Sequence, residues 1–233
     1  MLQIKQFRYN ADNLTYVLYG HTEACVIDGG AVEDILGFLK TRRLALNFIT
    51  NTHSHHDHTS GNSRLAKETG ARCLSFADLP DGRGLDLEGD AILVLRTPGH
   101  SEDSVCFYAA PYLISGDTLF NGTVGNCFSG DLRGFYHSIK KLTALPEETI
   151  VYAGHDYVKD SMTYASILDP RNKAIQEFLA AYSPEHVFST LKNELQMNPF
   201  LRLNEPGIAD FIKRQGLPCA TEWERWESLM RME

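Results

Sequence analysis

The sequence has few cysteines, and their spacing argues against two common ways of stabilising a small protein. Its five cysteines are scattered along 233 residues, and no two of them form a Cys-x-x-Cys pair. Disulfide frameworks and thiolate zinc sites both use paired, regularly spaced cysteines. We therefore expect the fold to depend on an apolar core, for which the 43% of hydrophobic residues is sufficient.

Long apolar runs and positive charge are also lacking. No run approaches the roughly 20 apolar residues that span a membrane. Residues 1–9 alternate like a strand and lack the apolar core of a signal peptide. The formal net charge is −8, and there is no polybasic tail. These features predict a cytoplasmic protein that binds neither membranes nor the phosphate backbone of nucleic acids, and they leave the oligomeric state open.

Potential metal ligands, in contrast, are concentrated in one short segment. His53, His55, Asp57 and His58 follow closely after residues 46–50, an apolar run typical of a buried strand. Residues two apart in an extended segment share a face, so His53 and His55 point the same way. Asp57 and His58 lie where the chain turns into a helix, and they point to a second position nearby. Because imidazole and carboxylate groups suit zinc and iron, this segment predicts ligands for two adjacent metal positions.

Three further ligand-type side chains, His100, Asp117 and His155, each follow a predicted strand. Loops at the ends of strands on a rigid sheet commonly carry functional residues, so we expect these side chains to join the first cluster. Asp28 also ends an apolar run and precedes two glycines. It is either a turn-forming residue or an acceptor that orients a ligand histidine from outside the ligand layer.

The order of apolar segments predicts two parts. Residues 1–165 mix strands with three helices, which is typical of a layered α/β domain. The expected strands are residues 1–9, 14–19, 24–28, 46–50, 71–76, 91–96, 105–109, 112–115 and 149–153, and the expected helices are residues 31–43, a helix that starts within 59–68, and residues 131–145. Residues 80–89 are polar and rich in glycine and predict a loop.

After about residue 166 only helices are expected. They cover residues 172–182, 191–198, 208–214 and 222–231. Residues 166–233 therefore predict a helical C-terminal extension that packs on the α/β domain and is too small to be a separate folding unit.

Taken together, these motifs resemble the metallo-β-lactamase superfamily. The motifs are Thr52-His53-x-His55-x-Asp57-His58, Gly99-His100, Gly116-Asp117-Thr118 and Gly154-His155, in that order. The closer similarity is to glyoxalase II, the hydroxyacylglutathione hydrolases. It rests on Gly154-His155-Asp156-Tyr157 and on the Ser-Thr-Leu and Asn-Pro-Phe-Leu-Arg motifs of residues 189–191 and 198–202. The resemblance implies an αββα sandwich of two mixed sheets covered by helices, with metal ions at one sheet edge and a helical C-terminal extension.

The resemblance also implies a centre of two divalent metal ions, with zinc expected first and iron or manganese as alternatives. His53, His55 and His100 would hold one ion. Asp57, His58 and His155 would hold the other. Asp117 would bridge both ions, and His56 would not be a ligand.

The implied reaction is the hydrolysis of a thioester, with an acylglutathione such as S-lactoylglutathione as the expected substrate. A hydroxide that bridges the two ions would attack the carbonyl carbon, and Asp57 and Asp117 are the expected catalytic residues. A thiolate leaving group needs little protonation, so no separate general acid is required. The sequence is consistent with this reaction because it contains no Gly-x-Ser-x-Gly nucleophile motif.

Contacts to the thiol part of the substrate are expected at Tyr157. In the loop where the family uses a lysine and a tyrosine to hold glutathione, this chain has Asn126 and Phe128.

The family also places an arginine and a lysine near its C-terminus, where our alignment finds two glutamates. These are Glu224 and Glu227, and Arg225 and Arg231 lie close enough in sequence to replace the missing bases.

Two other functions stay open from the sequence. One is an iron-dependent persulfide dioxygenase of the same superfamily, which uses one ion bound to the first histidine group and Asp117. The other is a metal-binding or partner-binding module without catalytic activity. The number of metal ions per chain separates the hydrolase from the dioxygenase. A metal-loaded protein that shows neither activity would indicate the binding module.

Overall fold

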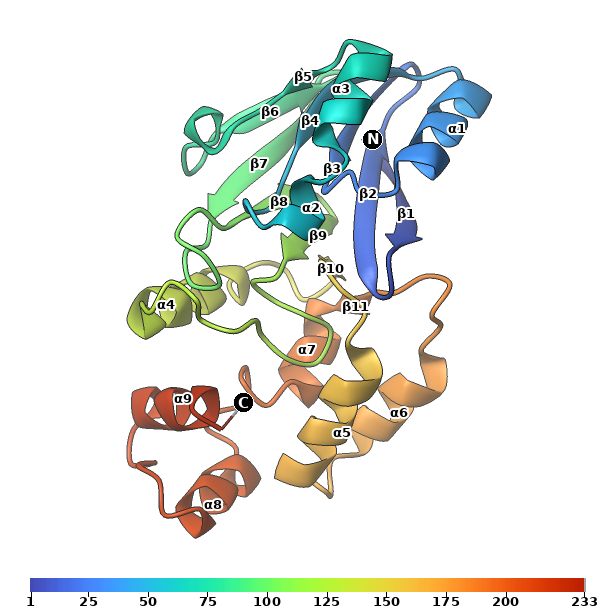
Figure 1. The fold of residues 1–233 in the computed structure, drawn as a ribbon. Helices are drawn as coiled ribbons and strands as arrows, with labels where there is room; N and C mark the ends of the chain where they lie inside the picture. The colour runs from blue at the N-terminus through green and yellow to red at the C-terminus, as the bar shows by residue number, and fades with distance from the viewer. Residues whose placement is uncertain (233) are drawn as a thin grey trace.

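The computed structural model describes residues 1–232, which form two sheets with helices on their outer faces (Figure 1). The first sheet has the order β1 (Gln3–Tyr9), β2 (Asn13–Tyr19), β3 (Glu23–Ile27), β4 (Ala45–Thr50) and β5 (Arg72–Cys73). The second has the order β11 (Ser189–Thr190), β10 (Ile150–Ala153), β9 (Tyr112–Gly116), β8 (Val105–Ala109), β7 (Asp90–Arg96) and β6 (Gly84–Leu87). Both sheets are mixed, because β3–β4, β4–β5 and β9–β10 pair in parallel and the other neighbours pair antiparallel.

Alternation of side chains along the strands separates the core into layers. In β2, Tyr16 and Leu18 belong to the core between the sheets, together with Phe107 of β8. Val17, between them in sequence, instead packs in the outer layer with Ile35 of α1 (Val32–Arg42). Every residue of β2 is buried, as expected for a strand covered on both faces.

Helices also cover the outer face of the second sheet. Leu95 and Leu113 from the strands share a cluster with Phe135 and Ile139 of α4 (Leu132–Leu142) and with Trp226 of α9 (Glu222–Met230). The order of layers is therefore helix, sheet, sheet, helix, and the predicted αββα sandwich is confirmed.

The remaining helices are short. They are α2 (His56–Thr59), α3 (Asn62–Thr69), the 3-10 helix η1 (Phe76–Asp78), α5 (Val158–Leu168), α6 (Lys173–Ala181), α7 (Leu191–Met197) and α8 (Pro206–Arg214). Helices α5 to α9 gather beyond the second sheet, at the bottom of Figure 1. None of the helices within residues 1–232 has the length and apolar character needed to cross a membrane.

Some local predictions were wrong. The expected loop over residues 80–89 contains β6, in which Leu85 and Leu87 are buried and the residues between and before them are exposed. The glycines around this segment are typical of a loop and made the short alternation of buried and exposed residues hard to recognise in the sequence. The strand expected over residues 71–76 is shorter, because only Arg72 and Cys73 pair with β4 before η1 begins.

The C-terminal part also differs from the expected run of helices. Ser189 and Thr190 form β11 and pair with β10, so this part contributes an edge strand to the second sheet. Helix α5 was not expected, because its mixture of polar and apolar residues gives a weak helical pattern. It crosses the boundary predicted between residues 165 and 166, and the division of the chain there stays a prediction.

Candidate metal centre

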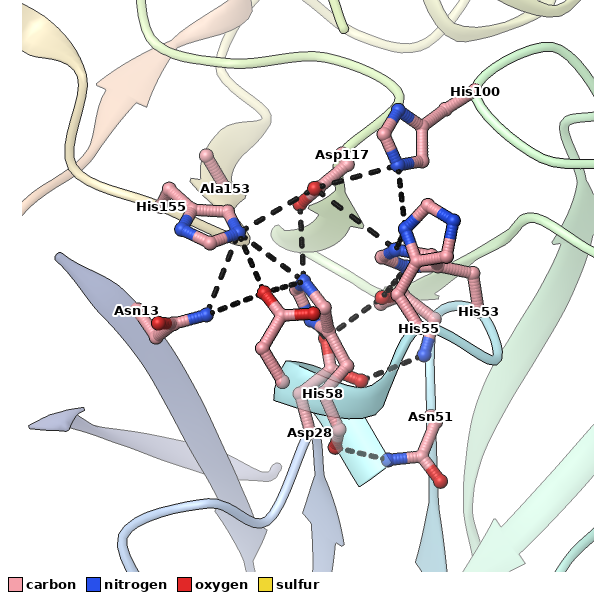
Figure 2. Close-up of polar contacts among 12 residues, drawn as sticks. Asn13, Asp28, Asn51, His53, His55, His58, His100, Asp117, Ala153 and His155 are labelled. Atoms are coloured by element: carbon pink, nitrogen blue, oxygen red, sulfur yellow. Dashed lines mark hydrogen bonds and ion pairs between the residues drawn. The ribbon is translucent and has the colours of Figure 1, made fainter. Parts of the chain in front are cut away.

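The ends of four strands bring ligand-type side chains to one place (Figure 2). His53 follows β4, His100 follows β7, Asp117 follows β9 and His155 follows β10. Strands β9 and β10 are parallel neighbours, so their carboxyl ends lie at the same edge of the second sheet. The turn into α2 adds the remaining side chains from the first sheet.

The first group consists of His53, His55 and His100. Nε2 of His53 lies 2.9 Å from Nδ1 of His55, and Nε2 of His100 lies 3.1 Å from the same atom. The His53 and His100 side chains are buried and His55 is half-buried. Their nitrogen atoms are close enough together to hold one metal ion.

The second group consists of Asp57, His58 and His155. Nε2 of His155 lies 3.3 Å from Nε2 of His58 and 3.3 Å from Oδ2 of Asp57. The same Asp57 oxygen is 3.5 Å from His58 Nε2. This group also has the composition and spacing of a metal site.

Asp117 lies between the two groups. Its Oδ2 is 3.6 Å from His100 Nε2, 4.0 Å from His53 Nε2 and 3.5 Å from His155 Nε2. Its Oδ1 is 3.5 Å from His58 Nε2. The carboxylate therefore faces nitrogen atoms of both groups, as a bridging ligand must.

Two features around Asp117 indicate that these residues fit bound metal ions. Oδ1 of Asp117 is buried and forms no hydrogen bond within residues 1–232, an arrangement that is costly unless another partner satisfies it. A Cβ atom on Gly154 would lie 2.1 Å from this oxygen, so glycine keeps room beside it. Together with the converging histidine nitrogens, these features fit divalent metal ions.

The electrostatic surroundings of the histidines differ between the two groups. Burial lowers the pKa of His53 to about 4, and it lowers the pKa of His100 as well, so both imidazoles are neutral. Burial acts on His58 in the same direction, but the Asp28 and Asp117 carboxylates outweigh it and raise the pKa of His58. Burial would raise the pKa of Asp117, yet the neighbouring imidazoles hold it well below its usual range. The surroundings of the second group thus favour positive charge.

Four of the five histidines use Nδ1 for a contact that points away from the centre. The contacts join His53 to Thr52 Oγ1 at 3.1 Å, His58 to Asp28 Oδ2 at 3.0 Å, His100 to the Asn126 carbonyl at 3.0 Å and His155 to Asp12 Oδ1 at 2.9 Å. Each contact fixes the ring orientation and leaves Nε2 for the centre.

Asp28 is therefore placed beside a predicted ligand. It is fully buried, has a φ of 57° and accepts hydrogen bonds from the Thr52 backbone at 2.8 Å and from the Thr52 hydroxyl at 2.7 Å. Its second oxygen faces His58. One carboxylate thus holds both the end of β4 and an imidazole of the second group.

Three residues of the β1–β2 hairpin were missed by the sequence reasoning. Asn13 donates to Asp57 Oδ2 at 2.9 Å, the Tyr9 hydroxyl donates to the Asp57 carbonyl at 2.8 Å, and Asp12 contacts His155. Asp12 and Asn13 are common turn residues, so their position between two strands gave no signal of a role at the centre.

Aromatic side chains flank the centre on two sides. Tyr157 stacks on His155, with ring centroids 5.0 Å apart and planes 5° apart, and it also contacts Phe120. Burial raises the pKa of Tyr157 to about 12, so its phenol keeps its proton. Phe128 is 69% exposed and lies 5.2 Å from the His100 ring and 6.0 Å from the His55 ring. Phe128 therefore stands beside the first group with a free face toward solvent.

The charged residues of α9 are occupied elsewhere. Glu224 accepts hydrogen bonds from the backbone at residues 220 and 221 and caps the helix. Arg225 donates to the carbonyls of residues 219 and 220 and to Asn204. Glu227 pairs with Arg231 at 2.9 Å. None of these four side chains lines the cavity of about 310 Å³ that Tyr157 helps to form.

Comparison with known proteins gives matches over most of the chain. Residues 11–72 and 74–155 match the model of the metallo-beta-lactamase superfamily, and residues 156–232 match the model described as hydroxyacylglutathione hydrolase C-terminus. A hydroxyacylglutathione hydrolase of Methylobacillus flagellatus is 37% identical over 214 residues, which are 84% of this chain and 86% of the relative. Another, of Pseudoalteromonas translucida, is 30% identical over 98% of this chain and 96% of the relative.

Solved structures show the same fold. The BLEG-1 B3 metallo-beta-lactamase matches with a TM-score of 0.66 and 25% identity, covering 86% of this chain and all of that one. ETHE1 from Myxococcus xanthus matches with a TM-score of 0.70 and 21% identity, covering 93% of this chain and 92% of that one.

Proposed function

The chain belongs to the hydroxyacylglutathione hydrolases of the metallo-beta-lactamase superfamily, and we propose on this basis that it hydrolyses glutathione thioesters at a centre of two divalent metal ions. The observation that carries the proposal is the placement of Asp117 between two groups of ligand-type side chains. A site for one ion would need only one of these groups.

The proposed ligands are those expected from the sequence. His53, His55 and His100 would hold one ion, Asp57, His58 and His155 would hold the other, and Asp117 would be shared by both. Zinc is the first candidate, and iron and manganese are the alternatives. The two carboxylates offset only half of the charge of two divalent ions, so the centre keeps positive charge and attracts an anionic substrate.

Two bound divalent ions would supply hydroxide at neutral pH and would polarise the thioester carbonyl. The protein residues orient the reacting groups around them. Asp57 is ionised, because a hydrogen bond from Asn13 and the nearby imidazoles lower its pKa against the effect of burial. Its carboxylate is 42% exposed, so it can accept a hydrogen bond from the attacking water. Asp117 is buried and fixes the separation of the two groups.

The proposed substrate is an acylglutathione, with S-lactoylglutathione as the first compound to test. Tyr157 and Phe128 flank the centre and are the proposed contacts for the substrate beyond the reacting carbonyl. A thiolate leaves without assistance from an acid, and no further proton donor is needed. We also propose that the protein acts in the cytoplasm and binds neither membranes nor nucleic acids, as its net charge of −8 and its lack of long apolar runs predict.

The test combines metal analysis with a turnover assay. The protein loaded with zinc, iron or manganese should contain two ions per chain and should consume S-lactoylglutathione, followed as loss of the thioester absorbance. One iron per chain with oxygen uptake on glutathione persulfide would instead establish the dioxygenase alternative. Full metal loading with neither activity would contradict the proposal and favour a binding module.

A further inference from the structure

A cavity of about 310 Å³ is linked to the candidate metal centre through Tyr157, which lines the cavity and contacts His155. Its walls are formed by Thr123, Tyr157, Asp160, Ser161, Tyr164 and Met232. The Tyr157 ring thus lines the cavity and also stacks on His155. A molecule whose reacting carbonyl is at the centre can therefore extend past Tyr157 into this space.

One side chain in the wall has an unused hydrogen-bonding group. Ser161 of α5 is only 5% exposed, and its Oγ has no hydrogen-bond partner in the part of the chain that the structure describes. A buried hydroxyl without a partner destabilises a protein by about 1 to 3 kcal/mol, so such groups usually have a partner in the functional state. Ser161 thus indicates that the cavity binds a polar group of a ligand.

The charge of the wall indicates the kind of group. Asp160, one residue before Ser161, is exposed at the rim and supplies a carboxylate. No lysine or arginine within residues 1–232 forms part of the wall. Arg225 and Arg231, the two bases suggested by the sequence, contact Asn204 and Glu227 instead. The cavity therefore disfavours a carboxylate and favours a cationic or neutral polar group.

We propose that this cavity binds the γ-glutamyl end of the glutathione moiety through its ammonium group and does not recognise the glycyl carboxylate. The inference rests on the proposed function, since it concerns the thiol part of the same substrate. The ammonium is the only cation in glutathione and pairs with Asp160, while Ser161 hydrogen-bonds a polar atom of the same end. Three extended residues reach roughly 10 Å, which is sufficient to pass from the centre around one aromatic ring.

The test measures binding of three stable thioethers to the metal-loaded protein by calorimetry. They are S-methylglutathione, its N-acetyl derivative, which lacks the ammonium, and its glycyl ethyl ester, which lacks the glycyl carboxylate. N-acetylation should raise Kd about 3- to 5-fold, the range of one partly exposed ion pair, and the ester should bind within about 2-fold of the parent. In Asp160→Asn the N-acetyl and parent compounds should bind equally.

Two further variants complete the design. Ser161→Ala should raise Kd for all three compounds about 2- to 10-fold, the effect of one lost hydrogen bond. Asp210→Asn, an exposed aspartate on α8 outside the cavity, should leave every Kd unchanged.

The outcomes separate this inference from the proposed function. Equal binding of the parent and N-acetyl compounds, or a large loss of affinity only with the glycyl ester, would overturn the γ-glutamyl assignment even in an active hydrolase. A persistent N-acetyl effect in Asp160→Asn would overturn the role of Asp160. Turnover of S-lactoylglutathione is measured separately, and its absence contradicts the hydrolase proposal without changing the meaning of the three dissociation constants.

Discussion

Replacing Glu194 with glutamine should change how the stability of this protein depends on pH. Glu194 of α7 is fully buried, and its Oε2 accepts hydrogen bonds from the Gly122 backbone at 3.0 Å and from Asn198 at 2.9 Å. Its Oε1 has no hydrogen-bond partner among residues 1–232. Burial raises the pKa of the Glu194 carboxyl from 4.5 to about 7.

The sign of the effect follows from proton binding. The folded protein holds the Glu194 proton up to about pH 7, whereas the unfolded chain releases it near pH 4.5. The folded state therefore binds more protons within this window, and the free energy of unfolding decreases as the pH rises through it. Above about pH 7 this contribution is constant. Between pH 4.5 and about pH 7 the contribution of Glu194 to the free energy of unfolding decreases by about 3 kcal/mol.

Glutamine stays neutral and can still accept both hydrogen bonds. Glu194→Gln should therefore match the original protein near pH 4.5 and exceed it by about 3 kcal/mol near pH 8. Urea denaturation of both proteins between pH 4.5 and 8.5 measures this difference, and other titrating groups and bound metal cancel in the comparison. Glu185→Gln, at an exposed glutamate, is the control and should show no difference that varies with pH.

A stability difference between the Glu194→Gln and original proteins that stays constant from pH 4.5 to 8.5 would refute the reasoning. It would mean that the carboxyl titrates alike in the folded and unfolded states. The result also bears on the centre, because Gly122, which Glu194 holds, lies in the loop that begins at Asp117 and contains Phe120. The C-terminal part of the chain thus supports the loop that begins at Asp117.

Three further predictions concern the centre. His58→Ala should leave one metal ion per chain by elemental analysis, because it removes a proposed ligand of the second group, whereas His56→Ala, at an exposed histidine in the same helix, should keep two. Asp28→Asn should weaken binding of one ion about 10- to 100-fold in competition with a chelator, since it removes the acceptor that orients His58; unchanged affinity would contradict that role. Phe128→Ala should raise KM for S-lactoylglutathione about 3- to 10-fold with unchanged metal content, and Phe188→Ala, at an exposed aromatic away from the site, should not.

The sequence predicts most of the residues that meet at the candidate centre, because these ligand-type residues occur in local patterns. His53, His55, Asp57 and His58 form one motif, and the other three ligand-type residues each follow an apolar strand. Parallel strands bring their carboxyl ends to one sheet edge, and sequence order is sufficient to place such residues together.

The supporting contacts are less predictable, because they depend on which distant segments meet. Asp12 contacts His155 across 143 positions of the sequence, and an isolated bridge between Asn13 and His155 brings the two segments together. The orientation of the Arg225 side chain is equally hard to predict from the sequence. Its hydrogen-bond partners depend on where α9 starts and where Asn204 lies. Packing geometry, and not residue type, decides both cases.

The central claim is that Asp117 joins two metal ions held by separate groups of side chains. Anomalous diffraction from crystals of the metal-loaded protein tests it most directly. We expect two peaks of comparable height, one among His53, His55 and His100 and the other among Asp57, His58 and His155, each within bonding distance of Asp117. A single peak in fully loaded crystals, or two peaks with Asp117 bound to neither, would contradict the claim.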